Sequence, residues 1–271
     1  MENYLTIDVE DYFQVSAFEK NINVDQWEGL ESRVVSNTDC ILETLDEFGV
    51  KATFFIVGWV AEKYPELVRS IRRRGHPIGC HSYLHQKVYT LTPAAFREDT
   101  YKAKSLLEDI AGQPVLGYRA PSYSITRKSL WALEILADLG FTYDSSIFPI
   151  VHDNYGIPHS PRFPYPHQHV NLYEYPISTA MILGRTVPVS GGGYFRLFPY
   201  WFTRWALDSI NTKEGQPFVF YLHPWEVDPD QPRIEHASLL SRFRHYNNLA
   251  KTQKRFKRLL KDFAFRPLPI E

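Results

Sequence analysis

The sequence predicts an α/β protein built on a parallel sheet or barrel with helices outside it. Three observations favour this class. Short apolar runs typical of buried strands alternate with longer segments whose apolar residues recur at helical spacing. Glycine closes several of the helical segments. The composition, 44% hydrophobic and 23% charged over 271 residues, provides ample material for a large core.

The first half of the chain repeats a strand followed by a helix. YLTIDVED, residues 4–11, is the first predicted strand, and the helix at 36–48 can be capped by Ser36 or Asn37. The later pairs are a strand at 51–58 with a helix at 61–74, a strand at 76–82 with a helix at 92–110, and a strand at 114–122 with a helix at 126–139. A fifth strand is predicted at 141–149. Such repetition is typical of parallel strands.

Local signals mark the ends of these helices. Gly49, Gly75 and Gly140 follow the first, second and fourth helix, where a residue of positive φ is favoured. Three arginines precede Gly75, as the helix dipole favours, and Pro93 lies in the first turn of the third helix.

The rhythm breaks in the second half. Residues 150–176 are rich in Pro, His and Tyr and are expected to form a long loop. Strand signals return at 173–178 and 217–225, and helices are expected at roughly 199–209 and 236–263. Because the chain contains no repeat, low-complexity tract or evident linker, we expect a single domain over residues 1–271, with a C-terminal elaboration from about residue 189.

Composition excludes several kinds of partner and compartment. A net charge of −1 does not favour nucleic acid or another polyanion. Cys40 and Cys80 make no disulfide framework, which fits a reducing compartment. The N-terminus lacks a secretory signal, and no apolar segment approaches the ~18 residues that a transmembrane helix needs. We therefore expect a cytoplasmic protein without a transmembrane segment.

The last predicted helix leaves an alternative open. Its basic residues alternate with apolar ones and comprise Lys251, Lys254, Arg255, Lys257, Arg258 and Lys261. This pattern usually means a docked helix with a solvated basic face. It is also found in helices that lie on a membrane surface, so a peripheral position at the inner face of the membrane is the alternative.

Polar residues cluster at the carboxyl ends of the predicted strands. They are Asp8, Glu10 and Asp11, then His81 and His85, then Arg119, then Asp144, then His223. In a parallel α/β barrel these ends form one rim, where active sites assemble. The sequence therefore predicts a site that draws one or more residues from each of five strands.

HSYLH places His81 and His85 four residues apart, so on a helical turn both imidazoles would share a face and could bind one divalent metal. A carboxylate from the first strand would complete the site, and another would act as a base on bound water. The alternatives are two unrelated histidines and an acidic strand end that faces solvent. The second does not explain Asp8, which lies between Ile7 and Val9.

Five stretches in order, within residues 6–226, carry a resemblance. They are TIDVED, HSYLH, RAPS, YDSS and LHPWE. The set resembles the motifs of the polysaccharide deacetylases of the NodB-homology group, carbohydrate esterase family 4. VSGGGYFRLFP, residues 189–199, further resembles the exopolysaccharide (exosortase-associated) subgroup. The chain departs from the family in its spaced Asp-Val-Glu-Asp motif and in Ser122, where the family usually has tyrosine.

The resemblance implies a distorted (β/α) barrel with fewer than eight strands. It also implies a divalent metal, most often zinc, held by His81, His85 and a carboxylate of the first motif. Glu10 aligns with the family's ligand, and the adjacent Asp11 is the alternative. Asp8 would be the general base, and Arg119 would pair with it and keep it ionised.

The resemblance assigns the remaining motifs to the acid and the substrate. His223 would protonate the leaving amine, with Asp144 holding its imidazole. By the same resemblance, the backbone N–H of Ser122 would face the oxyanion, and Pro121, Tyr123 and Trp225 would line the substrate groove.

The implied activity is hydrolysis of N-acetyl groups from amino sugars of an exopolysaccharide or its precursor, with release of acetate. The substrate would be an N-acetylated glycan, and whether it is linked to a lipid stays open. Two rival functions are hydrolysis of another non-peptide amide, of the ureide or imide type, and non-catalytic glycan binding. The second rival predicts the loss of a base, acid or ligand, and none is missing from the motifs.

Overall fold

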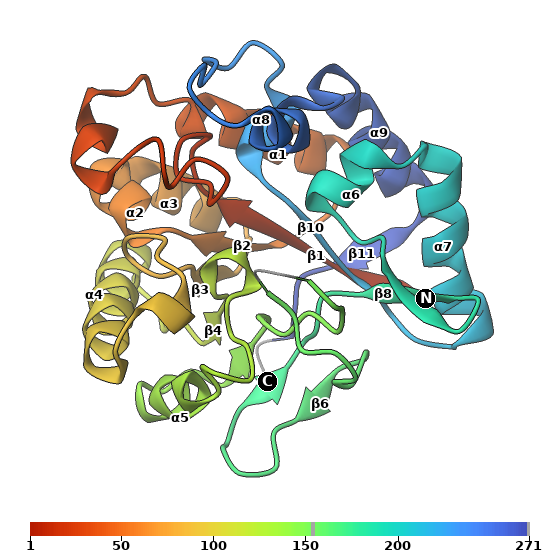
Figure 1. The fold of residues 1–271 in the computed structure, drawn as a ribbon, viewed down its shortest axis with the longest axis horizontal. Coiled ribbons are helices and arrows are strands. Elements are labelled where there is room, and N and C mark those ends of the chain that lie inside the picture. The colour runs from red at the N-terminus through yellow and green to blue at the C-terminus, as the bar shows by residue number, and fades with distance from the viewer. Residues whose placement is uncertain (153–154, 270–271) are drawn as a thin grey trace.

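Seven parallel strands follow one another across the central sheet in the computed structural model, which describes residues 1–152 and 155–269 (Figure 1). In spatial order they are β10 (Val219–Leu222), β1 (Glu2–Val9), β2 (Thr53–Ile56), β3 (Ile78–Cys80), β4 (Gly117–Tyr118), β5 (Tyr143–Asp144) and β7 (Tyr173–Glu174). Antiparallel β6 (Tyr165–Pro166) pairs with β7, and β11 (Ala264–Arg266) branches from β1. The sheet thus has nine strands.

The predicted fold class is confirmed. The seven parallel strands agree with a distorted barrel of fewer than eight, to which β6 and β11 are added. Within the described residues β10 and β6 form the two ends of the sheet and do not pair, so the barrel is open. Strands such as β2 and β10 are buried along their whole length, which explains why they read as continuous apolar runs.

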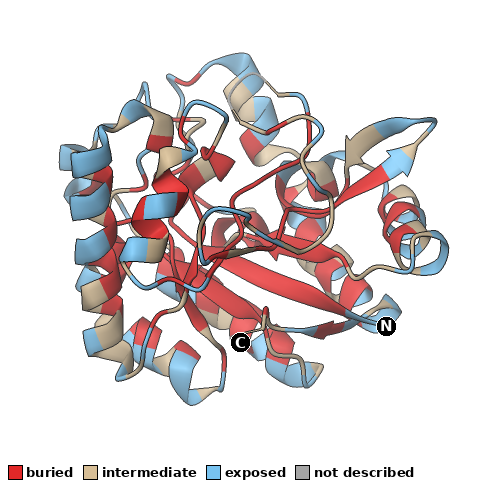
Figure 2. Cartoon of the chain, turned by 90° about the horizontal axis from the view of Figure 1, so that it is seen from below, coloured by how far each residue is buried: buried red, intermediate tan, exposed pale blue. Residues whose placement is uncertain are grey.

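Helices cover the outside of the sheet, with their exposed residues directed away from the buried strands (Figure 2). They are α1 (Val34–Glu47), α2 (Gly58–Lys63), α3 (Pro65–Arg73), α4 (Pro93–Ala111), α5 (Trp131–Asp138), α6 (Gly192–Leu197), α7 (Tyr200–Lys213), α8 (Leu239–Tyr246) and α9 (Leu249–Asp262). Short 3₁₀ turns are η1 (Val24–Gly29), η2 (Val88–Thr90), η3 (Pro121–Tyr123) and η4 (Pro224–Val227).

Two predicted helices are each divided in the structure. The helix expected at 61–74 is α2 and α3, because Tyr64 leaves the helical region with φ −129° and ψ 61° just before Pro65. The helix expected at 236–263 is α8 and α9, which meet at Asn248, a residue with φ 55°. Asparagine tolerates this left-handed conformation better than most residues, so it ends one helix and starts the next.

The second half contains a hairpin that the sequence did not predict. Antiparallel β8 (Thr179–Ile182) and β9 (Arg185–Pro188) flank Leu183 and Gly184, both of positive φ. Leucine is rare at such a position, so the turn carries no sequence signal. The expected loop at 150–176 also contains β6 and part of β7; residues 153–154 lie outside the described residues.

Both ends of the chain enter the same sheet. β1 pairs with β2, with β10 and with β11, so residues near the N-terminus lie beside residues from the last fifth of the sequence. The single domain over residues 1–271 stays a prediction. Every helix in the part of the chain that the structure describes is too short or too polar to cross a membrane.

Candidate active site at the rim of the sheet

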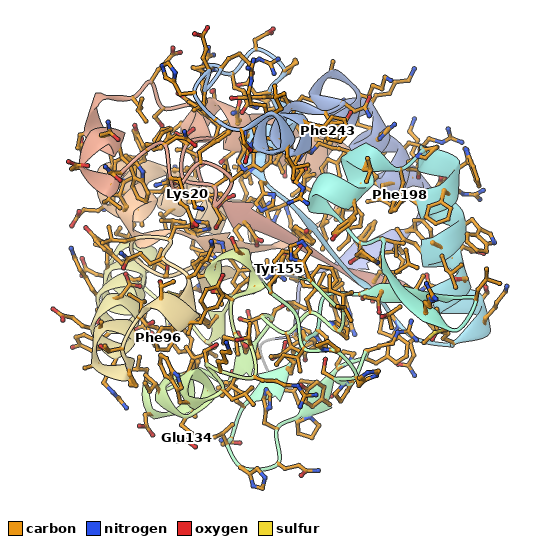
Figure 3. All side chains as sticks on the ribbon, viewed as in Figure 1. Lys20, Phe96, Glu134, Tyr155, Phe198 and Phe243 are labelled. Carbon is orange, nitrogen blue, oxygen red and sulfur yellow. The ribbon has the colours of Figure 1, made fainter. Side chains whose placement is uncertain are left out.

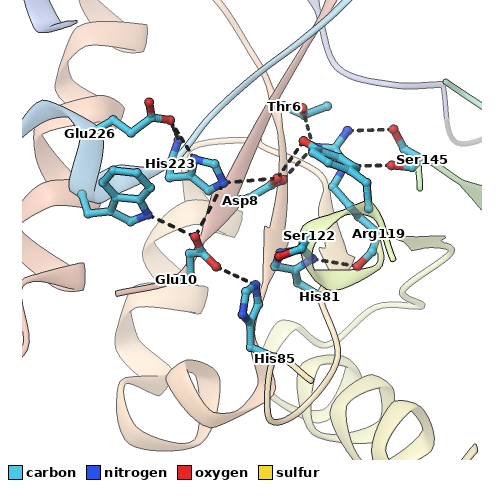
Figure 4. A network of polar contacts seen from close by, with 12 residues as sticks. Thr6, Asp8, Glu10, His81, His85, Arg119, Ser122, Ser145, His223 and Glu226 are labelled. Atoms are coloured by element: carbon cyan, nitrogen blue, oxygen red, sulfur yellow. Dashed lines mark hydrogen bonds and ion pairs between the residues drawn. The ribbon is translucent and has the colours of Figure 1, made fainter. Parts of the chain in front are cut away.

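Two carboxylates stand at the carboxyl end of β1. The register pairs Asp8 with Phe55 of β2 and places β10 on the other side, so the end of β1 is enclosed by neighbouring strands. Asp8 and Glu10 are consequently buried. Side chains from β1 and from the segments after β3, β4 and β10 converge there (Figure 4). This is the rim at which the sequence predicts the site.

Glu10, His81 and His85 form a buried group suited to a metal ion. One ligand atom of each lies within 4.8 Å of the others. Nδ1 of His81 lies 2.7 Å from the carbonyl oxygen of Arg119, which leaves Nε2 to bind a metal. Oε2 of Glu10 lies 2.6 Å from Nε2 of His85 and has no other partner in the described structure. A carboxylate oxygen and an imidazole nitrogen that face each other in this way can bind one cation between them. Two histidines and a carboxylate are a ligand set that fits zinc.

The two histidines reach this group by an irregular turn and not by the helical turn that their spacing suggested. Ser82 and His85 both have positive φ, and Oγ of Ser82 accepts a hydrogen bond from the backbone N–H of His85 at 2.9 Å. The imidazole centroids end 5.0 Å apart. The expected pairing of the rings holds, and the local backbone that produces it differs.

Asp11 lies apart from the candidate ligands, which corrects its place among them. Its carboxylate accepts hydrogen bonds from Oγ of Ser32 at 2.6 Å and from the backbone N–H groups of Arg33 and Val34 at 3.0 and 3.3 Å. These N–H groups stand at the start of α1, where they lack partners within the helix. Asp11 therefore caps α1. Of the two carboxylates left open by the sequence, the structure brings Glu10 to the histidines.

Asp8 is held by Arg119, as predicted. Nη1 of this fully buried guanidinium donates to Oδ1 of Asp8 at 2.6 Å and to Oγ1 of Thr6 at 2.7 Å. Its Nε and Nη2 donate to the carbonyl and the hydroxyl of Ser145 at 3.1 and 2.7 Å. The hydroxyl of Tyr123 lies 3.5 Å from the other oxygen, Oδ2. Asp8 is thus fixed by a cation, and Oδ2 remains available to the site.

His223 is held by Glu226, and the expectation that Asp144 would hold it is wrong. Nδ1 of His223 lies 2.7 Å from Oε1 of Glu226, and Oε2 of Glu226 accepts from Nε of buried Arg196 at 2.6 Å. Nε2 of His223 points into the site, 3.9 Å from Oδ2 of Asp8. Burial alone would lower the pKa of His223, but the carboxylates of Glu10, Glu226 and Asp8 raise it to about 9. The imidazole is therefore charged at neutral pH.

Asp144 is instead connected, through Ser146, to the backbone next to Arg119. Its Oδ1 accepts from Oγ of Ser146 at 2.5 Å, and that hydroxyl accepts from the backbone N–H of Ala120 at 2.8 Å. Asp144 lies directly opposite Glu174 in the β5–β7 pair. Burial, reinforced by the charge of Glu174, raises the pKa of Asp144 well above its ordinary range. A protonated carboxyl is a poor partner for an imidazolium.

Trp225 does not offer an open face to a sugar, which corrects its place in the groove. Only 5% of the residue is exposed. Its ring stacks between His223, at 5.2 Å and 20°, and His245, at 4.1 Å and 16°. Its Nε1 donates to Oε1 of Glu10 at 3.1 Å. Trp225 thus orients a candidate metal ligand and the imidazole beside it.

The other expected groove residues form the turn η3, from which Tyr123 reaches Asp8. Pro121 and Tyr123 are buried, and Ser122 is half-buried, with its hydroxyl in contact with the hydroxyl of Ser16. Ser122 and Tyr123 both have positive φ, so η3 is a strained turn. The ring of Tyr123 packs on Tyr221 with centroids 5.1 Å apart. Only Ser122 of the four therefore lies partly open at this wall.

Gly191 and Gly192 allow a close backbone approach. A Cβ on Gly191 would meet the carbonyl oxygen of Tyr221 at 2.0 Å, and one on Gly192 would meet its hydroxyl at 2.5 Å. Both glycines have positive φ. Tyr221 in turn packs against Tyr123 and His223. The glycines thus let the chain before α6 reach the wall of the site.

Sequence reasoning missed Glu226 and Arg196. Glu226 carried a signal, because a carboxylate three residues after His223 can bond it within one tight turn, here η4. Arg196 carried none, because it is distant in sequence from both residues. Its guanidinium also donates through Nη1 to the carbonyl oxygens of His245 and Asn247 at 2.6 and 3.0 Å.

Two families match adjacent parts of the chain. The polysaccharide deacetylase family matches residues 24–143, and a domain of unknown function (DUF3473) matches residues 145–269. Asp8 and Glu10 precede both regions. The first region contains His81, His85 and Arg119, and the second contains His223 and its partners.

Two curated relatives each match more than a third of the chain. A peptidoglycan-N-acetylglucosamine deacetylase of Bacillus cereus is 37% identical over 98 residues, which are 36% of this chain and 36% of that protein. A chitooligosaccharide deacetylase of Azorhizobium caulinodans is 31% identical over 102 residues, which are 37% of this chain and 46% of that protein. Across the first relatives the match spans about a third of their length.

Three solved structures share the fold. A putative polysaccharide deacetylase from Mycobacterium smegmatis has a TM-score of 0.59 at 22% identity and covers 99% of this chain and 88% of that one. A probable polysaccharide deacetylase from Pseudomonas aeruginosa has a TM-score of 0.60 at 14% identity, covering 97% and 86%. Puue allantoinase has a TM-score of 0.62 at 14% identity, covering 97% of this chain and 85% of that one. By the family match and these relatives, residues 24–143 of the chain are similar to the polysaccharide deacetylase family.

Proposed function

We propose that this protein is a metal-dependent N-deacetylase that removes acetyl groups from amino sugars of a glycan. The observation that carries the proposal is the convergence of three parts at one rim. These are the buried group of Glu10, His81 and His85, the ion pair of Asp8 with Arg119, and the pair of His223 with Glu226. A ligand set, a base and an acid are what amide hydrolysis requires.

The residues present fit a divalent metal. Glu10, His81 and His85 would hold the ion, and zinc is proposed because imidazole and carboxylate ligands suit it. Bound there, such an ion polarises a carbonyl and lowers the pKa of a bound water. Trp225 and the carbonyl oxygen of Arg119 orient two of the ligands from outside.

Asp8 and His223 would move the two protons of the reaction. Asp8, which accepts a hydrogen bond from Arg119, would take a proton from the attacking water as the new C–O bond forms. His223, charged at neutral pH, donates a proton to the nitrogen as the C–N bond breaks. The products are acetate and a free amine on the sugar.

The finer substrate and the compartment are parts of the same proposal. We propose that the substrate belongs to exopolysaccharide synthesis, as polymer or precursor, because residues 189–199 resemble the exosortase-associated subgroup. Gly191 and Gly192 of this segment lie against Tyr221, which packs on His223. A lipid-linked glycan and a cytoplasmic enzyme are consistent with that role. The relatives' own substrates, peptidoglycan and chitooligosaccharide, widen the panel to be tested.

Acetate release over a panel of N-acetylated oligosaccharides and lipid-linked amino sugars tests the proposal, with a cyclic ureide as the rival substrate. We expect acetate from a glycan, loss of activity with a chelator, and recovery with zinc. Glu10→Gln should lose the metal, whereas Asp8→Asn should keep the metal and lose turnover. Full activity after complete metal removal, or turnover of the ureide alone, contradicts the proposal.

A further inference from the structure

Helix α8 has an aromatic face toward the site and an apolar face toward solvent. On the inner face His245 stacks on Trp225, which stacks on His223, and Phe18 packs on both His245 and Tyr246. A short helix that covers the wall of a site normally presents polar residues outward. Here three of the four exposed residues of α8 are apolar, and the fourth is Arg244.

Three large apolar side chains stand on the outer face of α8. Leu239 is 83% exposed, Leu240 57% and Phe243 56%, and Phe243 can be located on α8 in Figure 3. Single exposed apolar residues need no explanation, but three on two turns of one helix form a patch. Ser238 caps this helix by accepting from the backbone N–H of Ser241 at 3.1 Å, so the patch is held on a formed helix.

The chain around this patch is strongly basic. Residues 231–261 contain nine Lys and Arg and one acidic residue, Glu235, in a protein of net charge −1. On α9 a surface groove of about 520 Å³ is lined by Gln253, Lys254, Lys257, Arg258 and Lys261. Within the described residues Lys251, Lys254 and Lys261 have no carboxylate within 4.0 Å, whereas Lys257 is paired with Glu47.

We infer that the outer faces of α8 and α9 dock on a bilayer containing anionic lipids. Leu239, Leu240 and Phe243 would enter the interface, and the unpaired lysines of α9 would face the headgroups. Apolar side chains flanked by cations are the combination that binds such surfaces, where each Lys or Arg contributes about 1 kcal/mol. An acidic glycan would satisfy the lysines and would leave the leucines in water, so it explains only half of the surface.

Docking by this surface has a geometric consequence. Because the inner face of α8 contacts Trp225 and, through it, His223, a bilayer against the outer face lies one helix away from the site. A glycan carried on a lipid would then reach the rim without leaving the membrane surface. This last step rests on the proposed function, whereas membrane binding itself does not.

Sedimentation of the full chain with vesicles tests the inference without any substrate. We expect binding to mixed phosphatidylcholine–phosphatidylglycerol vesicles, little binding to phosphatidylcholine alone, and weakening by salt. Reversing two lysines, Lys251→Glu with Lys254→Glu, should weaken binding about tenfold or more. Leu239→Ser with Phe243→Ser should weaken it at unchanged charge.

Matched controls separate this surface from general charge. Arg72→Glu with Arg73→Glu makes the same charge change on exposed residues of α3, and Leu130→Ser removes an exposed leucine beside α5. Both controls should bind like the wild type, and circular dichroism should show all variants folded. Equal loss in the α3 control, equal binding to neutral vesicles, or no binding at all overturns the inference. So does self-association that requires Phe243, which would make the patch a protein interface.

Discussion

Glu226 holds His223 from within one turn of chain, with Oε1 2.7 Å from Nδ1 of the imidazole and 3.0 Å from its backbone nitrogen. The other oxygen of Glu226 receives the buried guanidinium of Arg196. These residues all lie between 145 and 269, the region that matches a domain of unknown function. The side chains around Asp8 therefore come from both matched regions and from the segment before them, so neither region contains the whole cluster.

Replacing Glu226 should remove amide hydrolysis and spare a reaction that needs no acid. In Glu226→Gln the neutral side chain no longer stabilises the charged form of His223, so protonation of the leaving amine fails. We expect kcat/KM for an N-acetylated glycan to fall by roughly a hundredfold or more, the lower end of what general acid catalysis contributes. An activated aryl acetate should be hydrolysed nearly as before, because its leaving group departs without a proton.

Asp144→Asn is the matched control for that experiment. The amide keeps the shape of the carboxyl that holds Ser146, and Asp144 has no contact with His223. We expect a much smaller loss of activity than in Glu226→Gln. The reverse order of the two variants would restore Asp144 as the partner of the acid and refute the assignment of Glu226.

Arg196 and Glu226 should be strongly coupled in stability. Arg196→Met leaves the buried carboxylate of Glu226 without one of its two cationic partners, Arg196 and His223, which should lower the free energy of unfolding by about 3 kcal/mol. Adding Glu226→Gln removes the partly compensated charge and should recover part of that loss, but not the activity. Urea unfolding of the wild type, both single variants and the double variant measures this cycle. Additive losses would mean that the two side chains do not act as a pair.

The sequence predicts the parts of the fold that depend on local pattern. Strands β1 to β5 were foreseen because their apolar runs are buried on both faces, and the positions of Asp8, His81 and Arg119 followed from the ends of those strands. The β8–β9 hairpin was missed because its turn is made by a leucine of positive φ, a conformation enforced by the surrounding structure and not by the residue type.

The errors in the site arise where side-chain direction depends on distant residues. Trp225 appeared available for sugar because nothing in LHPWE shows that His245 covers its other face. Asp11 is adjacent to Glu10, but its carboxylate points toward the start of α1, a segment more than twenty residues later in the chain. The sequence predicts the residue types at the strand ends and the order of the strands along the chain. The direction in which adjacent carboxylates point is fixed by packing.

Substitution of Glu10 should therefore affect metal content, whereas substitution of Asp11 should affect stability. Glu10→Gln removes a ligand and should lose the bound metal, with activity lost in parallel. Asp11→Ala removes the cap of α1 and should lower the free energy of unfolding by about 1 kcal/mol, while metal content stays near the wild type. Elemental analysis and urea unfolding of both variants distinguish the two roles. Metal loss in Asp11→Ala without loss of stability would return Asp11 to the ligand set.

The pair of Asp144 and Glu174 should make folding take up a proton. Burial raises the pKa of Glu174 from 4.5 to about 7, against the backbone N–H of Ile147 and other hydrogen bonds that lower it. The pKa of Asp144, facing it across β5 and β7, is also raised. Between about pH 4.5 and 7 the native state thus binds more protons than the unfolded chain. This contribution to stability is complete below that range and is lost as pH rises through it.

Glu174→Gln isolates this effect from the other titrating groups. The amide oxygen can still accept from the N–H of Ile147, and the side chain no longer titrates. The stability of the variant relative to the wild type should therefore rise between pH 5 and 8, by about 2–3 kcal/mol in total. Urea unfolding of both proteins across this range gives the difference at each pH, in which the shared histidines cancel. A flat difference would mean that Glu174 is ionised in the native state and that its charge is balanced by a partner other than a proton.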